Sequence, residues 1–286
     1  MKKTINYWMF PGGLDGKVKV VDALKMAKKF GYEAIELCFA DSGEVSPETT
    51  KADAEKMLAD AKKNGIDIAS LCSGIYWGYN FSSSKQADRD KAVRATEKYL
   101  ELASWLKVDS ILVVPGAVDV FFNPAAEVIS YDDVHKRSVE CIKKLLPTAE
   151  KFKVTIAIEN VWNRFIMSPL EMNAYVDQFK SKYVGVYFDV GNVIPFGYPE
   201  QWIKILGNRI KKIHFKDFKF AAGNGGDIGF VDLLDGDVNW PAVVKALNDI
   251  GYNGPVTAEM IPYYKHYPIA RSEVTSIAMD YILGRK

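Results

Sequence analysis

The sequence is poor in cysteine and histidine, with three of each among 286 residues. A small, odd number of cysteines in a long chain argues against a disulfide-framed scaffold and is typical of reduced cytoplasmic thiols. No apolar run reaches the ~18 residues that a membrane-spanning helix requires. The basic residues Lys2 and Lys3 precede an apolar stretch that is too short for an export signal, and we interpret this stretch as a first strand. We therefore expect a cytoplasmic protein that does not bind a membrane.

An excess of charge of either sign is also missing. The chain has 37 Lys and Arg residues against 36 Asp and Glu residues, which gives a net charge of +1. Nucleic-acid-binding domains normally carry a basic domain or stripe, so we expect no nucleic-acid partner. Hydrophobic residues make up 48% and charged residues 26% of the chain. These are the values of an ordinary globular protein and exclude a disordered or collagen-like chain.

A short pattern recurs along the chain: a polar segment, a glycine and then an apolar run. It is found around Gly31, Gly65 and Gly251. A glycine directly after a helix adopts the left-handed C-cap conformation without steric cost. Each occurrence therefore predicts the end of a helix, a turn and the start of a strand.

Eight short apolar runs, rich in Val and Ile, begin roughly every 36 residues. A strand–helix–strand unit takes ~30 residues or more, and segments with helical spacing, such as 51–63, 89–106 and 131–152, lie between the runs. Eight alternations predict a (β/α)8 TIM barrel, a single α/β domain over residues 1–286. The predicted strands are 4–9, 33–39, 66–72, 109–115, 154–159, 184–189, 211–215 and 255–260.

The rival fold is an open, doubly wound sheet, which should carry a glycine-rich turn after its first strand. Gly12 and Gly13 follow the first run without the further spaced glycine, so we favour the barrel. Long loops are expected at 218–238 and 261–270. The glycine-rich segment 223–226 is either a phosphate-binding loop or a flexible turn, and we favour the turn because glycine is the default turn residue.

Four successive predicted strands each end in a side chain that can bind a metal: Glu159, Asp189, His214 and Glu259. Active sites of TIM barrels lie at the C-terminal ends of the strands. One such carboxylate alone would more often cap a turn or pair with a lysine. Three carboxylates converging at one mouth repel each other unless a cation lies between them, so we predict a single divalent metal ion bound by the four residues.

The ligand set consists of three carboxylates and one imidazole. Oxygen-rich sites suit six-coordinate Mn²⁺, Mg²⁺ or Co²⁺; we expect Mn²⁺, with Mg²⁺, Co²⁺ and Zn²⁺ as alternatives. Four protein ligands leave two octahedral positions, which two neighbouring oxygens of a sugar would fill.

These strand ends resemble the motifs of the sugar isomerase/epimerase superfamily, the xylose-isomerase-like TIM barrels. That group includes ketose 3-epimerases, hexulose- and pentulose-phosphate isomerases and epimerases, and inosose dehydratases. The resemblance covers essentially the whole chain and implies the same four metal ligands, with Glu159 and Glu259 as the acid/base pair. The motifs are Ile158-Glu159-Asn160, Phe188-Asp189-Val190-Gly191-Asn192, Ile213-His214-Phe215-Lys216-Asp217 and Ala258-Glu259.

The resemblance implies a metal-dependent isomerase or epimerase of a sugar or sugar phosphate. The metal would act as a Lewis acid and stabilise a cis-enediolate. For epimerisation, Glu159 and Glu259 would transfer protons on opposite faces of the sugar; for isomerisation, one carboxylate would move the proton along a single face. The alternative is an inosose-dehydratase-like lyase with the same metal site. A DNA-repair endonuclease on the related barrel would need several zinc ions and more histidines than three.

Further residues are candidates for binding the substrate. Lys216 would contact a substrate oxygen or pair with Asp217 or another rim carboxylate, and Asn192 stands where ketose 3-epimerases typically carry a histidine. Trp8 and Trp162 would stack on the sugar or pack at the rim. Glu36, at the end of the second strand, would accept from a hydroxyl or pair with a lysine. We expect a homo-oligomer, either a dimer or a tetramer.

Overall fold

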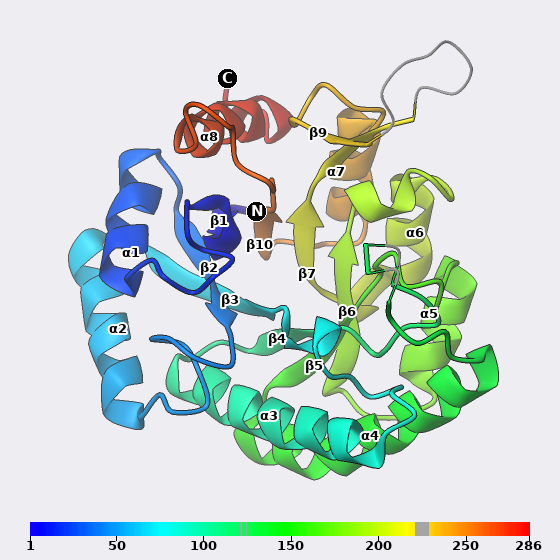
Figure 1. Cartoon of the computed structure of the whole chain (residues 1–286). Helices are drawn as coiled ribbons and strands as arrows, with labels where there is room; N and C mark the ends of the chain where they lie inside the picture. The colour runs from blue at the N-terminus through cyan, green and yellow to red at the C-terminus, as the bar shows by residue number, and fades with distance from the viewer. Residues whose placement is uncertain (121, 124, 221–228) are drawn as a thin grey trace.

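The chain forms a closed barrel of eight parallel strands, seen in a computed structural model that describes residues 1–120, 122–123, 125–220 and 229–286 (Figure 1). The strand order around the barrel is β1-β10-β7-β6-β5-β4-β3-β2. The strands are β1 (Lys2–Asn6), β2 (Ala34–Phe39), β3 (Asp67–Ser73), β4 (Ser110–Val113), β5 (Thr155–Glu159), β6 (Val184–Asp189), β7 (Ile210–Phe215) and β10 (Pro255–Ala258).

Eight α-helices alternate with these strands in the described residues and surround the barrel (Figure 1). The predicted (β/α)8 TIM barrel is therefore confirmed. The helices are α1 (Val20–Lys29), α2 (Lys51–Asn64), α3 (Gln86–Trp105), α4 (Tyr131–Phe152), α5 (Pro169–Asp177), α6 (Pro199–Leu206), α7 (Trp240–Asp249) and α8 (Ala270–Ile282).

Local sequence signals fix where several helices begin and end. Thr50 and Asp53 form a reciprocal capping box at the start of α2, which satisfies two backbone donors that the first turn leaves free. Gly65 closes the same helix with φ of 63°. Gly31 and Gly251 also have positive φ, 78° and 70°. The helix–turn–strand units predicted from the three glycines are thus present.

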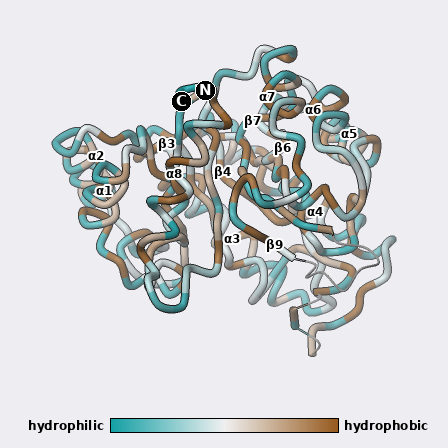
Figure 2. Tube along the Cα trace, turned by 90° about the horizontal axis from the view of Figure 1, so that it is seen from above, coloured by the Kyte–Doolittle hydropathy of each residue, from teal (hydrophilic) through white to brown (hydrophobic). Residues whose placement is uncertain are grey.

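The core follows from the alternation of strands and helices. Strands β5 and β6 are buried along their whole length, as expected for parallel strands covered on both faces. Figure 2 shows hydrophobic residues along the central strands and hydrophilic residues on outward turns of helices such as α2. None of the described helices combines the length and apolar character needed to cross a membrane.

The region after β7 differs from the predicted loop. It contains a short antiparallel ribbon of β8 (Asp217–Lys219) and β9 (Gly229–Val231). Strands of three residues are too short to show an alternating pattern, so they could not be predicted from the sequence. The glycine-rich segment 223–226 lies outside the described residues.

Asp217 anchors this ribbon to the barrel. Its buried carboxylate accepts hydrogen bonds from the backbone N–H of Leu234, at 3.0 Å, and from the indole of Trp240, at 2.9 Å. A Cβ on Gly236 would lie 2.0 Å from the same carboxylate, so only glycine fits there. This contact holds the ribbon over the C-terminal mouth of the barrel.

Candidate functional site

The four predicted metal ligands meet at the C-terminal mouth of the barrel. Glu159 and Asp189 are the last residues of β5 and β6, His214 lies near the end of β7, and Glu259 directly follows β10. These strands are neighbours around the barrel, and Asp189 and His214 are register partners. All four side chains are buried. One potential ligand atom from each lies within 4.8 Å of the others.

The arrangement of donor atoms fits a cation. His214 Nδ1 lies 2.7 Å from Glu259 Oε2 and 3.5 Å from Glu159 Oε1. Despite these short distances, Nδ1 has no well-oriented hydrogen bond, and neither does Asp189 Oδ2. Buried polar atoms normally have well-oriented hydrogen bonds, so two buried potential ligand atoms that lack one suit a bound ion. Three carboxylates and an imidazole are the donor set of a divalent metal site.

The other nitrogen of the histidine is held by Glu36. His214 Nε2 lies 2.7 Å from Glu36 Oε1, and both side chains are fully buried. Glu36 also accepts hydrogen bonds from Tyr187 Oη and from Asn6 Nδ2. Its carboxylate therefore lies behind the metal ligands, bonded to protein groups, and its pairing partner is His214 where the sequence suggested a lysine.

Lys216 lies between two of the metal ligands. Its Nζ is 3.1 Å from Asp189 Oδ2 and 3.1 Å from Glu259 Oε1. The ammonium also lies over the ring of Phe230, 4.9 Å from the centroid. The salt bridge weighed from the sequence is therefore present, although with these carboxylates and not with Asp217.

Burial and the neighbouring charged groups shift the pKa values of Glu159 and Glu259 in opposite directions. Burial raises the pKa of Glu159 to about 7, and the negative charge of Glu259 contributes to the rise. Burial would also raise the pKa of Glu259, but Lys216 and His214 together lower it to about 2. Two carboxyl groups whose pKa values are driven apart can act as acid and base.

The metal site opens into a cleft of about 530 Å³. Phe230, which no sequence motif singled out, also lines it. Asp189, His214 and Glu36 do not line the cleft and are buried behind the residues that do. The sequence-predicted residues that line the cleft are Trp8, Glu159, Trp162, Asn192, Lys216 and Glu259.

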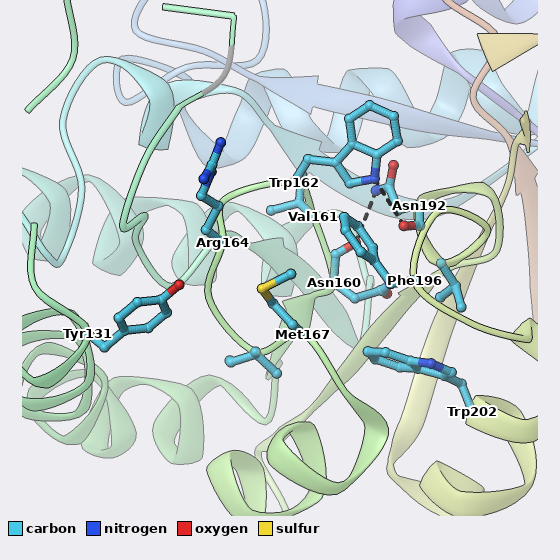
Figure 3. Close-up of a pocket in the computed structure, with 11 residues that line it drawn as sticks. Tyr131, Asn160, Val161, Trp162, Arg164, Met167, Asn192, Phe196 and Trp202 are labelled. Carbon is cyan, nitrogen blue, oxygen red and sulfur yellow. Dashed lines mark hydrogen bonds between the residues drawn. The ribbon is translucent and has the colours of Figure 1, made fainter. Parts of the chain in front are cut away.

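Asn192 links the cleft wall to the metal ligands. Its backbone N–H donates to Asp189 Oδ1 at 2.8 Å, and its side-chain amide donates to the carbonyl of Asn160 at 3.0 Å. The indole of Trp162 donates to the carbonyl of Asn192 (Figure 3). Trp162 also stacks on Phe230 with centroids 4.9 Å apart. These contacts fix one wall of the cleft beside Asp189.

A second, largely apolar cavity of about 360 Å³ adjoins the cleft and shares Trp162 and Asn192 with it (Figure 3). It lies between the loop after β5, which contributes Arg164 and Met167, and the loop after β6, which contributes Phe196. The four metal-ligand candidates do not line it.

The structure so far defines a TIM-barrel protein with a candidate metal site, a buried quartet of three carboxylates and one histidine at the C-terminal mouth. Residues 24–282 match the family model described as xylose isomerase-like TIM barrel. The chain therefore belongs to this family, as the strand-end motifs predicted.

Individual relatives agree with this assignment. A putative L-ribulose-5-phosphate 3-epimerase of Escherichia coli K12 is 25% identical over 244 residues, which cover 84% of this chain and 82% of the relative. Among solved structures, a D-psicose 3-epimerase from Clostridium cellulolyticum H10 shares 20% identity over 99% of each chain, with a TM-score of 0.78. The zinc-binding IOLI protein shares 19% identity over 100% of this chain and 99% of its own, with a TM-score of 0.74.

Proposed function

We propose that the chain is a divalent-metal-dependent isomerase or epimerase of a sugar or sugar phosphate. The observation that carries the proposal is the pair Glu159 and Glu259, which line one cleft, belong to the metal quartet and have opposite pKa shifts. The relationship to a putative ribulose-phosphate epimerase supports the substrate class, and the family supports a sugar-converting enzyme.

The metal would be held by Glu159, Asp189, His214 and Glu259. Bound there, a divalent ion supplies Lewis-acid polarisation of the substrate carbonyl. We propose Mn²⁺ because three of the four ligands are carboxylates. Zn²⁺ is the alternative, supported by the zinc atom in the structurally similar IOLI protein.

The two glutamates would divide the proton transfer. Lys216 and His214 keep Glu259 ionised, which suits it to take the proton from the carbon beside the carbonyl. Glu159, the second carboxyl group at the cleft, would return a proton to the resulting enediolate. Return on the opposite face inverts the carbon, whereas return to the neighbouring carbon on the same face isomerises the sugar.

The cleft supplies groups that would orient the sugar. Trp8 and Trp162 offer apolar ring faces, and Lys216 offers a cation beside the metal ligands. We propose that Lys216 and Asn192 contact substrate oxygens. Glu36 was also a substrate-binding candidate, but its bonds to His214, Tyr187 and Asn6 favour a supporting role.

An inosose-dehydratase-like lyase is the second candidate. The observation that favours it is the ammonium of Lys216, 3.1 Å from both Asp189 and Glu259. A cation at this position would donate a proton to a departing hydroxide. The reaction would then release water and would not form an isomer.

A substrate screen in D₂O distinguishes these activities. The Mn²⁺-loaded enzyme would be incubated with ketoses, ketose phosphates and keto-inositols, and the products followed by NMR. We expect deuterium at one carbon next to the carbonyl, with partial incorporation where a single face shields the proton. Loss of water would favour the lyase. Turnover that retains substrate deuterium completely at every position would contradict proton transfer and indicate hydride transfer. The proposed homo-oligomer is tested separately by light scattering.

A further inference from the structure

Two of the three cysteines lie side by side at the edge of the catalytic cleft. Cys38 in β2 and Cys72 in β3 are direct partners in the parallel register of these strands. Adjacent strands are about 4.7–4.9 Å apart, which is inside the ~4.4–6.8 Å between Cα atoms that a disulfide spans. Register partners point to the same face of a sheet. Glu36, two residues before Cys38, points into the barrel toward His214, so both thiols face the interior.

Hydrogen bonds hold both sulfur atoms in place. Trp8 Nε1 donates to Cys38 Sγ at 2.9 Å, and Asn6 Nδ2 donates to Cys72 Sγ at 3.4 Å. Burial, together with the neighbouring Cys38 thiol, raises the pKa of the Cys72 thiol well above its usual value. The two thiols therefore belong to neighbouring residues on the same face of the sheet.

The two thiols differ in their access to solutes. Cys38 is partly exposed and lines the same cleft as Glu159 and Glu259. Cys72 is fully buried. A small solute that enters the cleft therefore meets Cys38 first, and Cys72 is placed to react with Cys38 afterwards.

We propose that Cys38 and Cys72 form a dithiol site that small hydroperoxides oxidise to an intramolecular disulfide. The Cys38 sulfur attacks a peroxide oxygen, the O–O bond breaks, and hydrogen peroxide leaves one water and a sulfenic acid on Cys38. The Cys72 sulfur then displaces the hydroxyl group from Cys38, which forms the S–S bond and releases a second water. The thiols lose two protons and two electrons, and the peroxide gains both.

This chemistry is independent of the proposed isomerase activity, because it needs only the two thiols and the peroxide. All three cysteines are free thiols in this structure, so the proposed dithiol site is in its reduced state. Cys141, which lies in α4 and has Phe81 as its hydrogen-bond partner, has no neighbouring thiol and is the internal reference.

The test is peroxide treatment of the full chain, alkylation of the remaining thiols and peptide mapping by mass spectrometry. We expect one cross-linked pair that joins Cys38 and Cys72, the loss of two of three alkylatable thiols, and full recovery with dithiothreitol. Cys141→Ser should form the same cross-link. Cys72→Ser should stop at a sulfenic acid on Cys38 that dimedone traps.

The wild-type map alone is enough to overturn the proposal, so it does not depend on whether the variants fold. Oxidation of Cys38 to sulfinic acid while Cys72 stays alkylatable would show that the buried thiol does not resolve the sulfenic acid. Oxidation of Cys141 ahead of Cys38 would show that the cleft thiol is not the reactive one.

Discussion

Glu36 and His214 are joined across the interior of the barrel by a hydrogen bond of 2.7 Å between Oε1 and Nε2. Their strands, β2 and β7, are not neighbours in the sheet, since β1 and β10 lie between them. The bond fixes the orientation of the imidazole and turns Nδ1 toward Glu159, Asp189 and Glu259. A carboxylate on the far nitrogen also makes a histidine a more basic metal ligand.

Replacing Glu36 by glutamine should therefore weaken metal binding. Glutamine keeps the size of the side chain but loses the negative charge that faces His214. Loss of such an outer partner typically lowers metal affinity 10–100-fold, and isothermal titration with Mn²⁺ measures it. Glu55→Gln, on the exposed face of α2, is the matched control and should bind as the wild type does. Unchanged affinity in Glu36→Gln would show that the bond does not support the site.

Glu159→Gln and Glu259→Gln should each lower turnover by ~10²–10⁴-fold, the usual contribution of a positioned acid or base. Glutamine retains an oxygen donor but cannot accept a proton. Because both residues are also proposed ligands, Mn²⁺ affinity must be measured on the same samples. A variant that holds metal and substrate but turns over slowly is the expected result. Near-normal turnover of both variants with metal bound would rule out the two-carboxylate mechanism.

The sequence was sufficient to predict the barrel and the meeting of the four ligands. Each ligand ends a predicted strand, and parallel strands in one barrel carry their C-terminal ends to one mouth. The role of Glu36 could not be predicted from the strand-end pattern. Glu36 also ends a predicted strand, but its bond to His214 depends on side-chain directions across the barrel, which spacing along the chain does not encode.

Phe230 and the β8–β9 ribbon also could not be predicted from the sequence. The ribbon has strands of three residues, and Asp217 holds it through hydrogen bonds to Leu234, Val238 and Trp240. These contacts join residues about 20 positions apart in the chain. They depend on the folded path of the loop, which local propensity does not determine.

Metal affinity should rise with pH through the neutral range. Burial raises the pKa of Glu159 to about 7. Burial opposes the charge on His214, but Glu36 and Glu259 raise its pKa well above the usual value. Metal binding requires a carboxylate and a neutral imidazole, so it must release these protons and become tighter as the pH rises. Titrations with Mn²⁺ at about pH 6 and about pH 8 should show tighter binding at the higher pH; a flat profile would contradict the proton release.

The raised pKa of Glu159 also determines how the stability of the metal-depleted protein changes with pH. The pKa of Glu159 is raised from 4.5 to about 7. Its contribution to the free energy of unfolding is therefore fully present below pH 4.5 and is lost as the pH rises through about 7. Glu259, lowered from 4.5 to about 2, contributes above pH 4.5 and loses its contribution toward pH 2. Between pH 5 and about 7 the Glu159 contribution should therefore decline, and saturating Mn²⁺ should offset the decline in thermal melts.

Lys216→Met should destabilise the metal-depleted protein. The ammonium neutralises Asp189 and Glu259 in a buried site, and removing one partner of a buried ion pair costs about 3–5 kcal/mol. Urea unfolding in the presence of a chelator measures the loss. Lys219→Met, which removes an exposed pair with Asp235, should cost at most about 1 kcal/mol. Equal effects of the two substitutions would show that Lys216 is not a structural counter-ion.

Lys216→Met should act on substrate binding more than on chemistry. The substitution removes a positive charge beside the metal ligands, so Mn²⁺ should bind at least as tightly as in the wild type. A substrate oxygen would lose its cationic partner, which should raise KM while kcat falls less. Steady-state kinetics at saturating Mn²⁺ separate the two quantities, and Lys219→Met again serves as the control. A large fall in kcat at saturating substrate would instead place Lys216 in the chemical step. That result would favour the dehydratase, because an ammonium 3.1 Å from Glu259 is positioned to protonate a leaving hydroxide.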